Sequence, residues 1–201
     1  MSSARVEAQA QGEERPEKRP ASRSPGFSDL APSHRYAAMI VAVASGASVL
    51  VHFGLGARGL ISVGFVAVLA VVSTIDIQHG QIPNRVLVPA GCALLAAQVA
   101  FFPGQAAEWL AAGLGAGVAL LIPALVRRHA LGMGDVKLAA FLGIGLGKAV
   151  VGALLLGSLA AVPFAVAILV RRGVEARKQT MPLGPFLAFG GFLALLLSGS
   201  L

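Results

Sequence analysis

Apolar residues dominate the chain from residue 36 onward, in seven runs separated by short polar, glycine-containing or proline-containing stretches. The runs cover residues 36–55, 60–77, 86–102, 107–126, 136–147, 149–170 and 183–200. Most of them approach the ~20 residues that an α-helix needs to cross a bilayer. A helix satisfies its own backbone polar groups, which lipid cannot do. The pattern therefore predicts an all-α fold, a polytopic membrane helix bundle of about seven transmembrane helices.

The fifth run, residues 136–147, is short. As a helix it would extend about 18 Å at 1.5 Å per residue, so it could cross the bilayer or re-enter it. A run that turned back would place the basic loop at residues 171–178 outside, whereas cytoplasmic loops are the ones that carry an excess of lysine and arginine. We therefore favour seven crossings, with the N-terminus in the cytoplasm and the C-terminus outside.

The positions of the basic residues support this orientation. Only Arg58 and Lys148 would lie outside, and the net charge of +7 follows from the basic inner side, so we expect no nucleic-acid partner. The predicted inner set is Arg35, Arg85, Arg127, Arg128, Lys137, Arg171, Arg172, Arg177 and Lys178.

The first 34 residues differ from the rest of the chain. Five basic residues are balanced by five acidic residues, and four prolines interrupt any helix that could begin. A segment with so few apolar residues does not bury enough surface to fold alone. We predict a disordered cytoplasmic tail over residues 1–34 and a membrane domain over residues 35–201. The tail has no early apolar run and does not resemble a cleaved secretory signal.

Composition supports a membrane protein and limits the cofactors. Hydrophobic residues make up 56% and charged residues 12% of the chain, whereas about 25% of a typical soluble domain is charged. The single cysteine, Cys92, cannot form an intrachain disulfide or a multi-cysteine zinc site, and the four histidines are scattered. We expect no metal and no cofactor, and we interpret Cys92 as a small buried apolar residue.

Two aspartates stand out among the polar residues of the membrane domain. Of the four acidic residues after residue 34, Glu108 and Glu175 lie at predicted loop boundaries, where we interpret them as solvated. Asp76 ends the second apolar run, and Asp135 opens the fifth. A carboxylate costs roughly 2.5–3.5 kcal/mol at the centre of a membrane helix, so two aspartates beside membrane helices indicate a function that offsets this cost. The charge pattern places both at the same depth, near the cytoplasmic face.

Each aspartate belongs to a motif. Asp76 precedes Ile82-Pro83-Asn84. Asp135 lies within the segment 132–137, where two glycines come before the aspartate and Lys137 comes after it. Each could be a helix cap, with Lys137 as a local partner. The matched depth favours a shared role. Two adjacent carboxyls can share one proton, so that one acts as general base and the other as general acid in the hydrolysis of a peptide bond.

These motifs resemble those of the type IV prepilin peptidases, which are membrane aspartyl proteases of the GxGD class. The C-terminal segment 181–188 is also similar to the terminal signature of that family, with Leu183 in place of phenylalanine. The similarity covers roughly residues 63–200, and it implies that Asp76 and Asp135 are the catalytic pair. The supporting motif residues are Ile82, Pro83, Asn84, Gly132, Gly134, Lys137, Gly184 and Pro185.

The resemblance also implies a substrate and a location. The substrate would be a prepilin or pseudopilin precursor with a short basic leader before a hydrophobic helix, cleaved at the cytoplasmic face of the inner membrane. The chain is similar to the compact members associated with Flp-type, or tight-adherence, pili. Larger members have an extra cytoplasmic domain with paired cysteines and also N-methylate the new terminus. This sequence has neither feature, so the resemblance leaves N-methylation open.

Three other functions fit parts of the sequence. A GxGD protease acting on other membrane substrates would use the same pair of aspartates. A proton-coupled transporter should show inverted repeats and broken helices at the middle of the bilayer, which conflicts with two aspartates at one edge. A non-catalytic assembly subunit would leave the aspartates dispensable. The sequence does not indicate an oligomeric state.

Overall fold

The computed structural model describes residues 32–126, 132–172 and 183–199, and within them all regular structure is helical. Two single-turn 3₁₀ helices, η2 (Pro103–Gln105) and η3 (Gly147–Ala149), join α4 to α5 and α6 to α7. Each predicted apolar run coincides with one α-helix, so the all-α class is confirmed for these residues. The α-helices are α2 (Pro32–Phe53), α3 (Ala57–His79), α4 (Asn84–Phe101), α5 (Ala106–Val126), α6 (Met133–Leu146), α7 (Val150–Arg172) and α8 (Gly184–Ser198).

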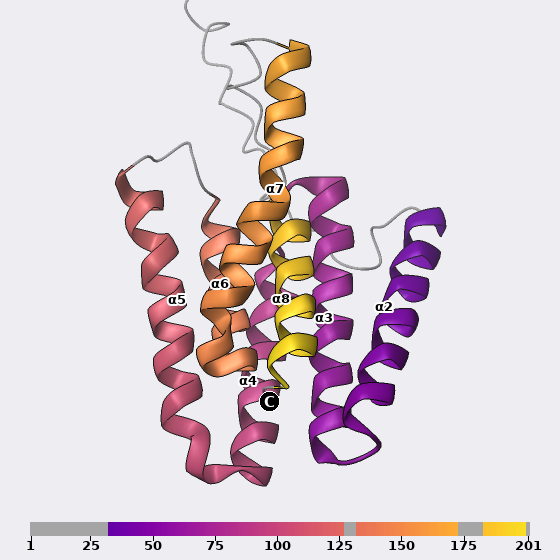
Figure 1. Ribbon diagram of the computed structural model, residues 1–201, viewed down its shortest axis with the longest axis vertical. Helices are drawn as coiled ribbons and strands as arrows, with labels where there is room; N and C mark the ends of the chain where they lie inside the picture. Colours follow the sequence, from indigo (N-terminus) through magenta and orange to yellow (C-terminus); the bar gives the residue numbers. More distant parts are fainter. Residues whose placement is uncertain (1–31, 127–131, 173–182, 200–201) are drawn as a thin grey trace, which may run out of the picture.

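Four stretches of the described residues are long and apolar enough to cross a membrane: Ala57–His79, Asn84–Phe101, Pro103–Val126 and Met133–Ala167. Met39–Phe53 and Gly184–Ser198 are apolar but shorter. The stretch Met133–Ala167 is not one straight helix. Gly147 ends α6 with a positive φ of 55°, and the chain then reverses into α7 (Figure 1). The short fifth run is therefore a helix of its own.

Successive α-helices run in alternating directions along the bundle (Figure 1). α3, α5 and α7 end at the upper end in this view, where α4, α6 and α8 begin, and the C-terminal end of α8 lies at the lower end. The end of α3 and the starts of α6 and α8 therefore lie at the same end of the molecule. These are the helix ends that carry the two aspartates and the C-terminal motif.

The central position of α6 fixes where its first turn lies. The helix packs against α4, α5, α7 and α8. Glycines allow close approach: a Cβ on Gly143 would overlap Ala112 of α5, and a Cβ on Gly145 would overlap the Phe65 ring of α3. Small residues at helix contacts are the usual means of close packing in membranes. Three leucines along α6 are almost fully buried: Leu138, Leu142 and Leu146.

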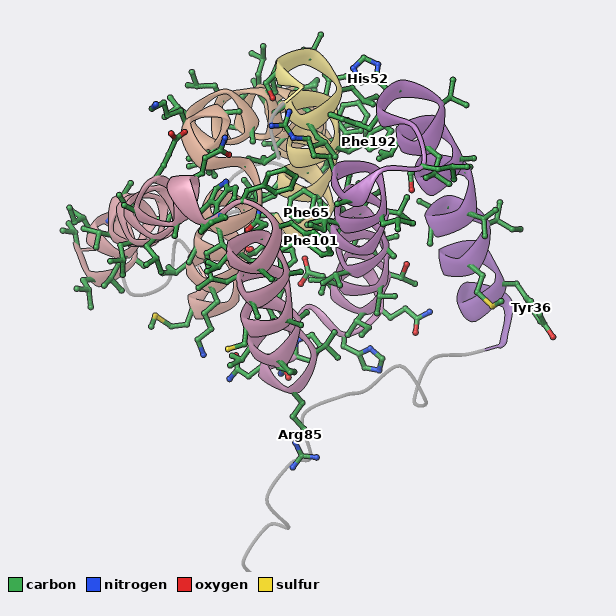
Figure 2. The ribbon with its side chains drawn as sticks, turned by 90° about the horizontal axis from the view of Figure 1, so that it is seen from below. Tyr36, His52, Phe65, Arg85, Phe101 and Phe192 are labelled. Atoms are coloured by element: carbon green, nitrogen blue, oxygen red, sulfur yellow. The ribbon has the colours of Figure 1, made fainter. Side chains whose placement is uncertain are left out.

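The outer surface of the bundle is apolar as well. Figure 2 shows Phe65 pointing into the bundle, whereas Tyr36 and Arg85 point away from it. Exposed apolar side chains such as Leu114 are expected where lipid is the solvent, because lipid tails are as apolar as the protein interior. Cys92 also lies exposed on this surface. The prediction that Cys92 is buried is therefore wrong. A small thiol is tolerated on the lipid-facing surface as well as in the interior of the bundle.

Most of the predicted tail lies outside the described residues. The same holds for residues 127–131 and 173–182, which include Arg127, Arg128, Arg177 and Lys178 of the predicted inner side. α2 begins at Pro32. The last three residues of the predicted tail, 32–34, are therefore helical.

Candidate active site

Asp76 lies in the last turn of α3 and is buried, with 4% of its surface exposed. α3 ends at His79 because Gly80 adopts the left-handed conformation, with φ of 59°, and donates its N–H to the backbone carbonyl of Asp76 at 2.8 Å. A glycine after the last helical residue is the common way to end a helix. The cap stops α3 one turn after the carboxylate and turns the chain toward Ile82.

Asp135 lies in the first turn of α6 and is 9% exposed. Its Oδ2 accepts a hydrogen bond from the backbone N–H of Gly132 at 3.3 Å, so the carboxylate caps the helix that carries it. A negative charge is favoured there because the unpaired N–H groups of a helix start are partly positive. The interpretation of Asp135 as a helix cap is thus confirmed, and it does not exclude a second role.

Asp76 and Asp135 lie at the same end of the bundle, although they are 59 positions apart in the sequence. α8 packs against both α3 and α6 and holds the two helices in place. The hydrogen bonds of each carboxylate use Oδ2. Within the described residues no donor bonds to either Oδ1. Among the described residues, each aspartate therefore has one oxygen that accepts no hydrogen bond.

The C-terminal motif supplies the second backbone donor of the site. The N–H of Gly184, the first residue of α8, donates to Oδ2 of Asp76 at 3.1 Å. A Cβ on Gly184 would lie 2.5 Å from that oxygen, so no larger residue fits without movement. Pro185 follows in the first turn of α8, where a helix does not need the N–H that proline lacks. Met181 and Pro182 of the motif lie outside the described residues.

The segment Ile82-Pro83-Asn84 packs against the glycines of the second motif. A Cβ on Gly134 would lie 2.9 Å from the Cβ of Ile82, so the two motifs are in direct contact. Pro83 is fully buried and precedes the first residue of α4. These contacts bring the turn after Asp76 onto the start of α6.

Lys137 bonds Asn84 and not an aspartate. Its Nζ donates to Oδ1 of Asn84 at 2.8 Å on the exposed side of the site. The interpretation of Lys137 as the local partner of Asp135 is therefore wrong. The bond ties the start of α4 to the start of α6 beside the carboxyl pair.

The structure thus brings all ten predicted site residues to one end of the bundle. His79, three residues after Asp76, lies exposed at the end of α3. Among the described residues, no three His, Cys, Asp or Glu side chains come together as metal ligands. Sequence reasoning missed Gly80, although a glycine after the last apolar turn is itself a signal for a helix end. It also missed the bond from Gly184 to Asp76, which no local pattern predicts.

Comparisons with known proteins identify a family for this chain. A model of the type IV leader peptidase family matches residues 63–166, which include both aspartates. The prepilin leader peptidase/N-methyltransferase of Bacillus subtilis (strain 168) is 30% identical over 168 residues. That similarity covers 82% of this chain and 66% of the length of the relative. No solved structure matches the chain.

Proposed function

The chain belongs to the type IV leader peptidase family, and we propose that it is a membrane aspartic endopeptidase. In this proposal it removes the short basic leader from prepilin or pseudopilin precursors. The observation that carries the proposal is the placement of two buried carboxyls at one end of the bundle, Asp76 in the last turn of α3 and Asp135 in the first turn of α6. The chain spans only 66% of its relative's length. The activity, substrate and partners of this chain are therefore proposals and are not taken from the relative.

In the proposed mechanism Asp76 and Asp135 share one proton, because two carboxylates so placed do not both ionise cheaply. The ionised carboxyl takes a proton from a bound water, and the resulting hydroxide attacks the scissile carbonyl carbon. The protonated carboxyl donates to the carbonyl oxygen or to the leaving amine. The backbone N–H groups of Gly132 and Gly184 hold the Oδ2 atoms, so the Oδ1 atoms are the ones offered to water and peptide.

The proposed location is the inner membrane, with seven crossings and the aspartate pair at the cytoplasmic boundary. The alternating helix directions support this depth, since both aspartates lie in the terminal turns of their helices. The connections from α5 to α6 and from α7 to α8 join helices at the end that holds the pair, and their sequences contain Arg127, Arg128, Arg177 and Lys178. Basic connections favour the cytoplasmic side.

We further propose that the chain is a compact, Flp-type peptidase. The single cysteine supports this subtype, because the paired cysteines of larger relatives are lacking. The name of the Bacillus subtilis relative includes N-methylation, which is not part of the proposal for this chain. A transporter is disfavoured, because both aspartates lie at helix ends and not at mid-depth. A protease acting on other membrane substrates would share this site, and the substrate tests distinguish it.

The proposal is tested by cleavage of a purified precursor. The protein, in detergent or nanodiscs, is mixed with a full-length pilin precursor that carries a basic leader before its hydrophobic helix. We expect a single cut at the boundary between leader and helix, mapped by intact mass and N-terminal sequencing. A control precursor with its leader basic residues changed to glutamine should be cut more slowly. Cleavage of unrelated membrane helices at equal rates would contradict the substrate class.

A further inference from the structure

A large apolar groove lies between α5 and α7, away from the aspartate pair. Its volume is about 700 Å³. The α5 wall consists of small residues, with Ala111, Gly115 and Ala119 one turn apart, and the α7 wall includes Val151 and Leu155. A Cβ on Gly115 would meet no atom within 4 Å, so the groove is open at this wall. Apart from Ser158 the polar lining is confined to one end.

That end carries two opposite charges. The Nζ of Lys148 lies 2.9 Å from Oε2 of Glu108, and the backbone N–H of Lys148 donates to Oε1 at 3.4 Å. The side chains are 85% and 37% exposed, so both remain accessible. Glu108 is therefore exposed to solvent, as predicted, and it also pairs with Lys148. The pair lies at the start of α5 and in η3, at the end of the bundle opposite the aspartates (Figure 1).

We propose that this groove binds a zwitterionic phospholipid with an amine headgroup. One acyl chain lies along the small-residue wall of α5. The headgroup phosphate lies beside the ammonium of Lys148, and the headgroup amine lies beside the carboxylate of Glu108. Lys148 has three N–H donors on Nζ and the carboxylate has several lone pairs, so their mutual bond leaves donors and acceptors for the headgroup. The inference is independent of the proposed peptidase activity.

The length of the groove and the position of its charges match an acyl chain with one polar end. From Glu108 to Ala119 the groove follows about 17 Å of α5, at 1.5 Å per residue. The charged end also matches an amphiphile, whose single polar group sits at one end of an apolar chain.

Native mass spectrometry of the full chain tests the proposal. The protein is equilibrated with equal amounts of phosphatidylethanolamine and phosphatidylglycerol of the same acyl composition. We expect a preference for phosphatidylethanolamine of about two- to fivefold, the range of an exposed ion pair. Glu108→Gln should abolish the preference, because it removes the partner of the amine and leaves Lys148 to bind either phosphate.

Variants that fill the groove provide the second readout. Gly115→Leu and Ala119→Leu should each reduce bound lipid of both kinds, while Gly152→Leu, which adds the same side chain to α7 outside the groove lining, should not. Equal retention of the two lipids by the unchanged protein would overturn the headgroup assignment. Equal retention by Gly115→Leu and Gly152→Leu, or a disulfide between two copies of Gly115→Cys in a Cys92→Ala background, would overturn the groove assignment.

Discussion

The backbone N–H of Gly184 donates a 3.1 Å hydrogen bond to Oδ2 of Asp76, across 108 residues of sequence. The start of α8 thereby holds the carboxylate at the end of α3. A helix start is a favourable neighbour for a carboxylate, because its unpaired N–H groups are partly positive. The C-terminal motif is therefore part of the site and not a separate packing element.

Gly184→Ala should lower cleavage strongly while the protein still accumulates. The added Cβ would lie 2.5 Å from Oδ2 of Asp76, so the carboxylate or the start of α8 must shift. A misplacement of about 1 Å can cost about 10²-fold in rate. The measurement is the initial rate of precursor cleavage, with membrane content checked by immunoblot. Gly152→Ala is the matched control, since its Cβ meets no atom within 4 Å. Equal rates for the two variants would exclude a tight fit at Gly184.

Asp76→Asn and Asp135→Asn should each reduce cleavage by about 10²–10⁴-fold, the usual contribution of a general acid or base. An amide keeps the shape of the side chain but can neither share the proton nor ionise. The double variant should be little worse than either single variant, because residues that act as a unit lose their effect together. Single-turnover rates with a fluorescent precursor measure this. Independent, multiplying losses would show that the aspartates do not form one catalytic unit.

Lys137→Met and Asn84→Ala should affect stability rather than chemistry. Their hydrogen bond of 2.8 Å ties α4 to α6 on the exposed side of the site, and one such bond contributes about 0.5–1.5 kcal/mol. Each variant should lower the thermal midpoint slightly, and the double variant should lower it no further than the more damaging single change. Thermal unfolding in detergent measures the coupling as a double-mutant cycle. Fully additive shifts would mean that the bond carries no energy.

The helices could be predicted from the sequence because their signal is local. Seven apolar runs correspond to α2–α8, and even the short α6 is predicted as a separate helix. The reversal at Gly147 follows from the positions of basic residues, which set helix direction in membranes. Boundaries such as the start of α2 at Pro32 are harder to predict, because a polar turn of helix at a membrane boundary has little pattern of its own.

The partners within the site could not be predicted, because they depend on how helices rotate against each other. The sequence indicated that Asp76 and Asp135 share a depth, because the positions of the basic residues predict helices that cross in alternating directions. It did not indicate that Lys137 bonds Asn84, since a lysine two residues from an aspartate suggests a local pair. Nor did it indicate that Glu108 meets Lys148. Both pairs join residues that lie far apart along the chain, and only packing brings them together.

Cleavage activity should survive chelators and serine-directed reagents and should fall as the pH is lowered. The proposed reaction uses one ionised and one protonated carboxyl. Lowering the pH adds a proton to the ionised member, so the base is lost while the acid remains. Rates are measured across pH with precursor in excess, and the protein is returned to neutral pH to check that the loss is reversible. Loss of activity with a chelator, restored by zinc, would contradict the two-carboxyl mechanism.

The end of the bundle that holds the aspartates should face the cytoplasm. Gln81 lies exposed in the turn after Asp76, and Arg58 lies exposed at the opposite end, at the start of α3. Cys92 is exposed, so both Gln81→Cys and Arg58→Cys are made in a Cys92→Ala background, where the introduced cysteine is the single thiol. In intact cells a membrane-impermeant thiol reagent should label Arg58→Cys and spare Gln81→Cys, and permeabilised cells should show labelling of both. The reverse pattern would place the aspartates outside, where a precursor that has not been exported cannot reach them.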